Sequence, residues 1–309
     1  MMPSSSSLPF KLAVAAAMAS LALSGCSTAS QSNASTPSGT TGFEASTVSQ
    51  DEALAALVPA DLKAKGTLTV GSDTSYAPAE FLGGDDGQTP QGYDVDLAKA
   101  IGATLGLTTE VATSEFTGIL PALGTKYDLG ISSFTINPER SKTVNFVSYF
   151  NAGTQWAVLK GNPGGLTLED LCGKRVGVQT GTVQDPDVAE RSKVCVADGK
   201  EAIEVISLKS QTDVTTRLVN GGIDAMAADS PVTGYALSQT GDSLENLGEV
   251  YDGAKQGIAV AKSDKELAEL VGKVVNKLIS DGTYAKILES WSNSDGAIVK
   301  AQVNPESGS

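Results

Sequence analysis

The fold is decided by the stretch Gly130-Ile131-Ser132-Ser133-Phe134-Thr135-Ile136-Asn137-Pro138-Glu139-Arg140. It joins the end of an apolar strand to a helix, because Asn137 is a favourable N-cap and Pro138 suits the first helical position. The strand is expected to bring the hydroxyls of Ser132, Ser133 and Thr135 to one edge of a sheet, beside Arg140. Hydroxyls and a guanidinium are groups that keep a buried carboxylate ionised. On this segment alone, a strand-to-helix turn with a surface arginine fits equally well.

Six further segments accompany this stretch in a fixed order. They are residues 66–78, 92–97, 116–123, 173–182, 224–229 and 281–284, the last followed by Trp291. Together the seven motifs resemble, in residues and in order, the polar amino-acid-binding proteins of ABC importers, which are family-3 solute-binding proteins. The resemblance covers about residues 66–292.

Short β-branched runs alternate with segments of helical periodicity, which predicts an α/β fold. We expect strands at 67–70, 127–132, 174–178 and 223–228, and helices at 95–105, 184–191, 212–219 and 267–279. The last helix is the clearest, since a capping box at 263–266 precedes an apolar stripe and Gly282 follows it. The sequence Thr167-Leu168-Glu169-Asp170 resembles a second capping box and predicts another helix start.

The resemblance implies a two-lobed, periplasmic-binding-protein-like fold of type II, in which the chain crosses twice between the lobes. Lobe 1 is expected to comprise residues 52–154 and 256–293, and lobe 2 residues 155–255, with a C-terminal tail at 294–309. The ligand is expected between the lobes at the carboxyl ends of strands, where open α/β sheets usually bind their ligands.

The N-terminus reads as a secretory signal at residues 1–25, with Lys11 before an apolar run at 12–23 that is too short to span a membrane. Leu23-Ser24-Gly25-Cys26 resembles the bacterial lipobox, and cleavage before Cys26 would leave its thiol to carry a lipid anchor. The alternative is an ordinary signal peptide with an accidental cysteine. Residues 26–51 are polar and predict a flexible tether, so we expect a lipid-anchored protein on the extracytoplasmic face of the cell membrane.

Two further cysteines, Cys172 and Cys195, follow in the chain. An exported protein lies where disulfides persist, so we expect the two to be bonded. The loop of about 23 residues that they close corresponds to about 3 kcal/mol of stability in the loop-entropy model. The alternatives are two free thiols or a metal site. Two cysteines this far apart make a poor metal site in a chain that has no histidine.

An amino acid is a zwitterion, so its pocket needs an anion partner and a cation partner. The resemblance implies that Arg140, with Ser132, Ser133 and Thr135, binds the α-carboxylate. Backbone N–H groups of Gly181 and Thr182, at the start of the expected helix 184–191, would favour the same carboxylate.

The cation partner implied by the resemblance is Asp229, at the end of a strand, although a helix N-cap before Ser230-Pro231 is a credible alternative. Tyr76 and Phe116 are expected to enclose the ligand side chain, although aromatics at such positions are more often core residues. Asp73, which can also cap its own loop, is expected to contact a cationic side chain, with Glu80 a weaker candidate. Gln179 is expected to contact a polar one.

Other functions are less well supported by the composition. The net charge of −14 argues against a nucleic acid as partner. The acidic segments 85–87 and 94–96 lack the spacing of a calcium loop, and we expect neither a metal nor a cofactor. The absence of histidine removes the usual catalytic triads, so we do not expect an enzyme. The resemblance implies a monomeric binding protein that closes on its ligand and delivers it to a membrane permease. The alternatives are a dehydratase-like enzyme on this fold, a protein for a non-proteinogenic amino-acid derivative and a receptor module.

Overall fold

The computed structural model describes residues 42–306 of the chain, which lie within one compact unit. The expected signal peptide, Cys26 and most of the expected tether lie outside the described residues. The strands are β1 Thr67–Ser72, β2 Ser75–Tyr76, β3 Glu80–Gly83, β4 Thr89–Gln91, β5 Thr108–Thr113, β6 Leu129–Gly130, β7 Val144–Leu159, β8 Arg175–Gln179, β9 Glu204–Leu208, β10 Ala225–Asp229 and β11 Leu244–Ala261.

The helices alternate with the strands. They are α1 Glu52–Ala55, α2 Ala60–Lys65, α3 Tyr93–Leu105, α4 Phe116–Ile119, α5 Pro138–Thr143, α6 Gln184–Ala197, α7 Gln211–Val219, α8 Ser230–Gln239, α9 Lys265–Ser280 and α10 Thr283–Ser290, with short 3-10 turns at η1 Ala45–Thr47, η2 Leu120–Ala122, η3 Gly241–Ser243 and η4 Ser294–Gly296. The α/β fold class predicted from the sequence is confirmed.

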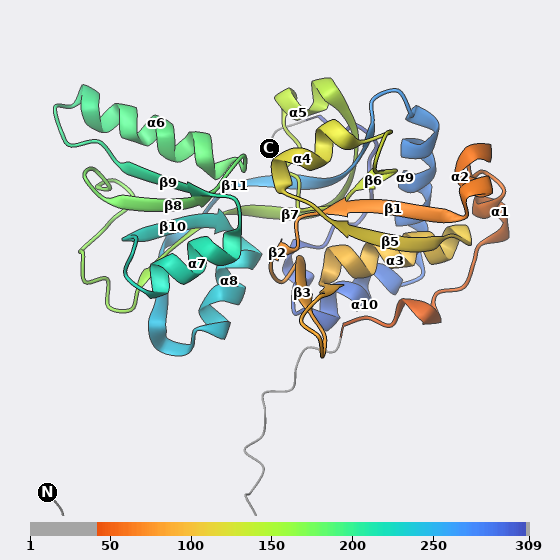
Figure 1. Cartoon of the computed structure of the whole chain (residues 1–309), viewed down its shortest axis with the longest axis horizontal. Coiled ribbons are helices and arrows are strands. Elements are labelled where there is room, and N and C mark those ends of the chain that lie inside the picture. Colours follow the sequence, from red (N-terminus) through yellow and green to blue (C-terminus); the bar gives the residue numbers. More distant parts are fainter. Residues whose placement is uncertain (1–41, 307–309) are drawn as a thin grey trace, which may run out of the picture. The chain divides into compact units, whose positions relative to one another are not determined.

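The strands follow the order β5-β1-β6-β11-β7-β10-β8-β9, and β2-β3-β4 form a small separate sheet. The parallel strands β5, β1 and β6 belong to lobe 1, and the parallel strands β10, β8 and β9 belong to lobe 2 (Figure 1). The long strands β7 and β11 pair antiparallel from Val144 with Ala261 to Leu159 with Leu244, and they run through both lobes. The chain therefore crosses between the lobes twice, along neighbouring strands.

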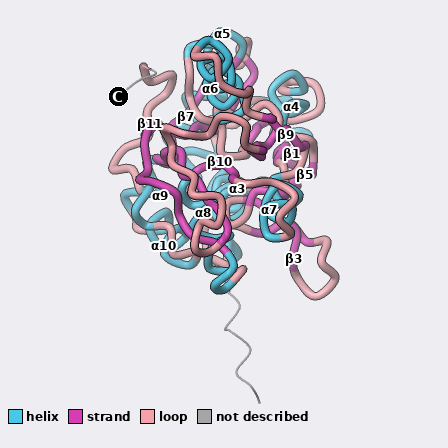
Figure 2. The backbone as a smooth tube through the Cα atoms, turned by 90° about the vertical axis from the view of Figure 1, so that its left-hand side faces the viewer, coloured by secondary structure: helices cyan, strands magenta, loops and turns pink. Residues whose placement is uncertain are grey.

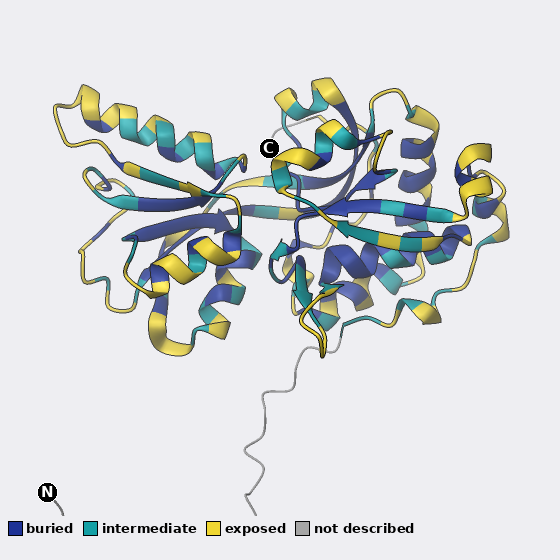
Figure 3. Ribbon diagram, viewed as in Figure 1, coloured by how far each residue is buried: buried dark blue, intermediate teal, exposed yellow. Residues whose placement is uncertain are grey.

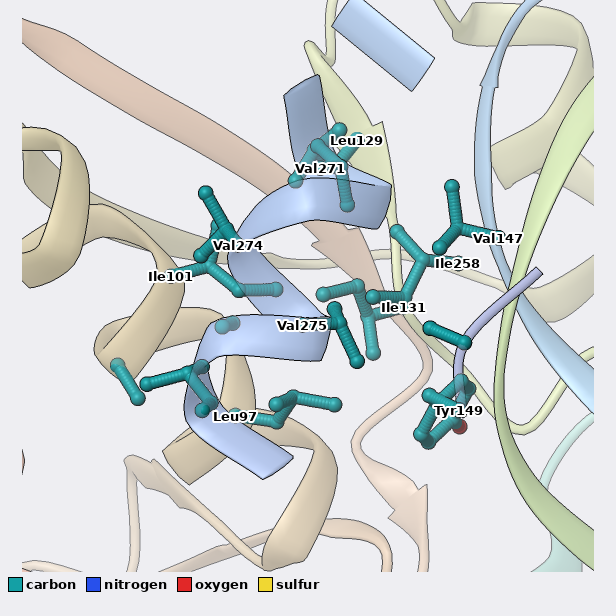
Figure 4. Packing of buried hydrophobic residues seen from close by; sticks show 14 of the residues in the cluster. Leu97, Ile101, Leu129, Ile131, Val147, Tyr149, Ile258, Val271, Val274 and Val275 are labelled. Atoms are coloured by element: carbon teal, nitrogen blue, oxygen red, sulfur yellow. The ribbon is translucent and has the colours of Figure 1, made fainter. Parts of the chain in front are cut away.

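Each lobe buries its inner strands, such as β8 and β10, beneath helices, whereas the edge strands β5 and β9 are partly exposed. In Figure 2, where lobe 2 faces the viewer, helices lie around the strands, and Figure 3 shows buried strands under helices such as α6 and α7 whose outer faces are exposed. In lobe 1, α9 packs its apolar stripe against α3 and the sheet (Figure 4). The residues in this contact include Leu97, Ile101, Leu129, Ile131, Val147, Ile258, Val271, Val274 and Val275. The stripe predicted at 267–279 is thus core. No helix within residues 42–306 is long and apolar enough to cross a membrane.

One expected helix is absent from the described chain. Residues 167–170 form a turn in which the N–H of Asp170 donates to the carbonyl oxygen of Thr167 over 3.1 Å. Gly173 follows at φ 72°, and β8 begins at Arg175. The prediction of a helix start here is wrong, because too few residues separate the capping pattern from the next strand.

The packed part of lobe 1 extends beyond both boundaries expected from the sequence. On the N-terminal side, the backbone N–H of Phe43 donates to the Asp96 carboxylate over 2.8 Å, and Phe43 packs against the lobe 1 core. On the C-terminal side, Ala297 and Val303 form isolated bridges with β7. Residues 43–51 and 297–304 therefore contact lobe 1, where a tether and a tail were expected.

Lobe 2 contains the expected disulfide. Cys172 precedes β8 and Cys195 lies in α6, with their Cα atoms 5.5 Å apart. The bond packs among the apolar residues of the lobe 2 core. It ties a helix on one face of the sheet to the turn that leads into the central strand, so the prediction of a bonded pair is confirmed.

Candidate ligand-binding site

A narrow cavity lies between the two lobes, at the carboxyl ends of strands from both. Its lining comprises Asp73, Tyr76, Glu80, Phe116, Ser132, Ser133, Thr135 and Arg140 of lobe 1, with Gln179, Thr182, Val183, Gln184 and Asp229 of lobe 2. Ten of the eleven residues expected from the sequence to bind the ligand are in this lining; Gly181 is the exception. The structure thus brings together side chains that are up to 156 positions apart, from Asp73 to Asp229.

Arg140 is held in place by its own helix start. The Asn137 side chain caps α5 by accepting from the Arg140 N–H over 2.8 Å. The guanidinium donates to the carbonyl oxygens of Thr135 over 2.9 Å and Gly181 over 3.0 Å, and it lies over the Phe116 ring. Burial lowers the pKa of Arg140, and the charge of Asp229 opposes that shift. Two of five donors are used in these bonds, so the guanidinium keeps capacity for a carboxylate.

Asp229 ends β10 and stands at the N-cap position of α8, yet its side chain makes no capping bond. Its two carboxylate oxygens instead accept from Gln184 Nε2 over 2.9 Å and Gln256 Nε2 over 2.8 Å. Its backbone N–H donates to the Tyr76 hydroxyl of lobe 1 over 3.1 Å. Burial raises the pKa of Asp229 to about 6. The carboxylate is therefore turned away from the helix and toward the cavity, which favours a cation partner over the alternative of an N-cap.

Asp73 differs from what the sequence suggested. One carboxylate oxygen accepts from the Ser75 N–H over 3.2 Å and its hydroxyl over 2.6 Å. The other accepts from the Phe116 N–H over 2.8 Å and from Gln179 Nε2 over 3.1 Å. A carboxylate has about four acceptor sites, and here four donors occupy them. Asp73 caps its loop and α4 and contacts lobe 2, so it has no spare acceptor for a ligand cation.

Two of the three hydroxyls expected to face a ligand carboxylate, those of Ser132 and Ser133, are directed to Glu80. Ser132 Oγ donates to one Glu80 oxygen over 2.9 Å and accepts the Asp73 N–H over 2.9 Å. Ser133, at φ 50°, donates from its hydroxyl to the other Glu80 oxygen over 3.3 Å. The physical reason is that a fully buried carboxyl needs donors, and these two hydroxyls supply them.

The turn after β8 also differs from the expectation. The Gly181 N–H, expected to face the ligand, donates to the Asp185 carboxylate over 3.1 Å. The Thr182 hydroxyl donates to the Gln179 carbonyl oxygen over 2.8 Å. The chain is left-handed at Gly181, with φ 80°, and its carbonyl oxygen faces Arg140. The contribution of Gly181 is thus a contact between the lobes.

Known proteins resemble this chain in sequence and in fold. Residues 68–294 match the family model of the bacterial extracellular solute-binding proteins, family 3. The chain belongs to this family. A relative of this family-3 solute-binding protein, the arginine-binding protein ArgT of Corynebacterium glutamicum, is 34% identical over 254 residues, which are 81% of this chain and 82% of ArgT.

Solved structures agree in fold. An ancestral arginine-binding protein, solved bound to arginine and bound to glutamine, is 37% identical with a TM-score of 0.66; the matches cover 73% and 74% of this chain and 98% of the other. The ancestral amino acid-binding protein AncCDT-1, a precursor of cyclohexadienyl dehydratase, is 32% identical with a TM-score of 0.66 and covers 75% of this chain and 97% of its own. The two-lobed fold of the family is therefore the fold of this solute-binding protein.

In this family-3 solute-binding protein, three residues in or next to the site were not predicted from the sequence to belong to it. Gln184 opens α6 and is buried against Asp229, and Gln256 reaches the same carboxylate from β11. Asp94, expected to mark only a helix start, is buried in α3 beneath the cavity, where it accepts from the Tyr149 hydroxyl over 2.7 Å. The two glutamines carry no sequence signal, whereas a carboxylate between the apolar residues Tyr93 and Val95 at the start of α3 was a signal for Asp94.

Proposed function

We propose that this family-3 solute-binding protein captures a free amino acid with a cationic side chain between its lobes and delivers it to the permease of an ABC importer. The observation that carries the proposal is that Arg140 and Asp229 line one cavity from opposite lobes. An α-carboxylate can pair with the guanidinium and an α-ammonium with the Asp229 carboxylate, so a zwitterion would connect the two lobes.

The preference for a cationic side chain rests on a third ionisable group. Glu80 also lines the cavity and is fully buried, with no salt bridge to any lysine or arginine within residues 42–306. A buried carboxyl without a cationic partner is a natural partner for a guanidinium or ammonium of the ligand. The arginine-binding relatives support this choice.

A thermal-shift panel of the twenty amino acids, with citrulline and ornithine added, tests the proposal. A ligand at one hundred times its Kd stabilises the folded protein by about 2.7 kcal/mol, which is a clear shift of the unfolding temperature. We expect arginine, lysine or ornithine to give the largest shift. The absence of a shift with every amino acid would contradict amino-acid binding itself, and a largest shift with a neutral or acidic amino acid would contradict the cationic preference.

We also infer binding without turnover. One observation favours a dehydratase-like alternative, namely a buried carboxyl of raised pKa, Glu80, in the cavity wall, which is what an acid–base residue needs. The similarity to a dehydratase precursor points the same way. Incubating the protein with amino acids and prephenate-like compounds and following loss of substrate by mass spectrometry separates the two, because a binding protein returns the compounds unchanged.

The membrane attachment is a proposal as well. We propose that the mature chain begins at an acylated Cys26 and is held at the extracytoplasmic face of the cell membrane as a monomer. The support is the lipobox-like sequence and the polar segment after it. Delivery to a permease favours such an anchor, because a tether confines the ligand-loaded protein near the membrane.

A further inference from the structure

Two carboxyl groups lie against each other beneath the proposed ligand cavity. Glu80 and Asp94 are both fully buried, and their side chains are within hydrogen-bonding range of each other. Glu80 lines the cavity, whereas Asp94 lies behind it in α3. The pair is therefore reached from the ligand side through Glu80 alone.

The donors around this pair leave one oxygen unpaired. Asp94 Oδ2 accepts from the Ser133 N–H over 2.9 Å and from the Tyr149 hydroxyl. Asp94 Oδ1 is buried and has no hydrogen-bond donor among the described residues. Because buried polar atoms are almost always paired, this oxygen needs a donor, and a protonated Glu80 within hydrogen-bonding range can supply one.

The surroundings favour retention of that proton. The groups facing the pair are the hydroxyls of Ser132, Ser133, Tyr76, Tyr93 and Tyr149. The charges nearby are the carboxylates of Asp73, which raises the pKa of Glu80, and of Asp229, which raises the pKa of Tyr93. Burial, followed by the neighbouring Asp94, raises the pKa of Glu80 well above its usual range, and burial raises that of Asp94 to about 6. Two carboxyls in one dry site cannot both ionise readily, so the pair titrates as a unit.

We infer that the Glu80–Asp94 pair shares one proton in the ligand-free protein and releases it to solvent when a cationic ligand side chain binds beside Glu80. The inference rests on the proposed function and deepens it, because it makes recognition of the ligand cation an exchange. One positive charge, the proton, leaves the pair as another, the guanidinium or ammonium, arrives. A ligand with a neutral side chain leaves the proton in place.

Calorimetry of the full chain with arginine and with citrulline tests the exchange. Citrulline is nearly isosteric with arginine, has the same α-carboxylate and α-ammonium, and carries no side-chain charge. Titration at pH 7 in phosphate and in Tris, whose ionisation enthalpies differ, gives the number of protons released. We expect about one more proton per arginine than per citrulline. Equal release by the two ligands would overturn the inference.

The pH dependence gives a second measurement. The affinity for arginine is expected to rise about ten-fold per pH unit relative to citrulline, up to the pH at which the free pair loses its proton, and then to level off. Protons released from Asp229 by the α-ammonium cancel in this comparison, since both ligands carry that group. An affinity ratio independent of pH from 5 to 9 would contradict the exchange.

Variants localise the proton. Glu80→Gln is expected to abolish the difference in proton release between arginine and citrulline. Asp73→Asn keeps the Glu80–Asp94 pair intact, so this variant should retain the difference in proton release even if it binds both ligands more weakly. If Glu80→Gln does not fold, Tyr149→Phe serves instead. The Tyr149 hydroxyl lowers the pKa of Asp94, so its removal should extend proton release to higher pH. Retention of the full difference in Glu80→Gln, or an unshifted profile in Tyr149→Phe, would place the proton elsewhere. Failure of all amino acids to bind would instead contradict the proposed function.

Discussion

The Arg140 guanidinium of lobe 1 donates to the carbonyl oxygen of Gly181 in lobe 2 over 3.0 Å. Beside it, Gln179 donates to Asp73, the Asp229 N–H donates to Tyr76, and Gln256 Nε2 of lobe 1 donates to the Asp229 carboxylate, so these four hydrogen bonds join the lobes around the cavity. Each of these bonds uses a residue of the proposed site. Closure of the lobes and ligand binding therefore depend on the same side chains.

Removal of the Arg140 side chain is expected to weaken binding of the cognate amino acid severely. Truncating one partner of a buried charge pair costs about 2–5 kcal/mol, so Arg140→Ala should raise the Kd roughly 30-fold to several thousand-fold. Arg140→Lys should recover only part, because an ammonium does not reproduce the two-pronged contact. Calorimetry gives both values.

The carboxamide of the same amino acid is the control for Arg140. It lacks the anionic group that the guanidinium is proposed to bind, so the mutation should affect the acid far more than the amide. If Arg140→Ala binds both as the parent does, the site built around this residue is wrong.

Asp73→Asn is expected to weaken arginine and citrulline alike. Its four acceptor positions are occupied by Ser75, Phe116 and Gln179, and an amide cannot accept all four bonds. Leaving one buried donor unpaired costs about 1–3 kcal/mol, or roughly 5-fold to 150-fold in affinity. A loss confined to arginine would instead support the sequence-based interpretation that Asp73 contacts a ligand cation.

The ligand-free protein should become more stable as the pH falls from 7 to 5. Burial raises the pKa of Asp94 and of Asp229 from the usual 3.8 to about 6, so the folded state binds protons that the unfolded chain does not yet bind at these pH values. For Asp229 alone this pKa shift corresponds to a change of at most about 3 kcal/mol in the free energy of unfolding. Urea unfolding at several pH values measures the effect.

Asp229→Asn is the matched variant for this dependence. It should be more stable than the parent at pH 7 and less sensitive to pH between 5 and 7. The carboxyls whose pKa is lowered, Asp86, Asp224 and Asp281, lose their contribution only at more acidic pH. Stability that increases from pH 5 to pH 7 in the parent would contradict the expectation.

Reduction of the Cys172–Cys195 bond should lower the unfolding free energy by about 3 kcal/mol. Cys195 is buried in α6, so neither sulfur should be alkylated in the folded, unreduced protein. Mass spectrometry with and without reductant checks the bond, and the double substitution to alanine reproduces its loss. Rapid alkylation of both cysteines without reductant would exclude the disulfide in solution.

Protein from its native host should begin at Cys26 and carry lipid. The lipobox-like sequence before Cys26 is the reason for this expectation. Intact-mass and peptide analysis should show a lipid-sized increment on the Cys26 peptide, and Cys26→Ala should release the protein from the membrane fraction. An unmodified N-terminus at another residue would remove the lipid anchor from the proposal.

The sequence was sufficient where local patterns match the fold. The stripe of α9 and the Asn137 cap follow from periodicity and capping, and the site positions after β1, β6, β8 and β10 follow from the family resemblance of the ordered motifs. It was insufficient where a side chain had two plausible partners. Nothing in the spacing of Ser132 and Ser133 indicates that their hydroxyls donate to Glu80, 52 and 53 positions away.

The same limit explains the unpredicted glutamines and the misassigned turn. Gln184 and Gln256 contact Asp229 from different elements, and such a contact becomes visible only when β10, α6 and β11 are placed together. The capping pattern at 167–170 is locally consistent with a helix, but the short distance to β8 overrides it. Tertiary packing, not local preference, decides both cases.

The pairing of β7 with β11 also makes lobe 2 an insertion within the chain of lobe 1. The chain leaves lobe 1 along one strand and returns along its immediate neighbour, with Ala152 opposite Ala254. A short turn between these two residues would close lobe 1 into a single hairpin-joined chain, and the excised segment 153–253 would keep its two ends side by side. Dividing β7 and β11 at this paired position thus separates the two lobes, and every other connection stays within one lobe.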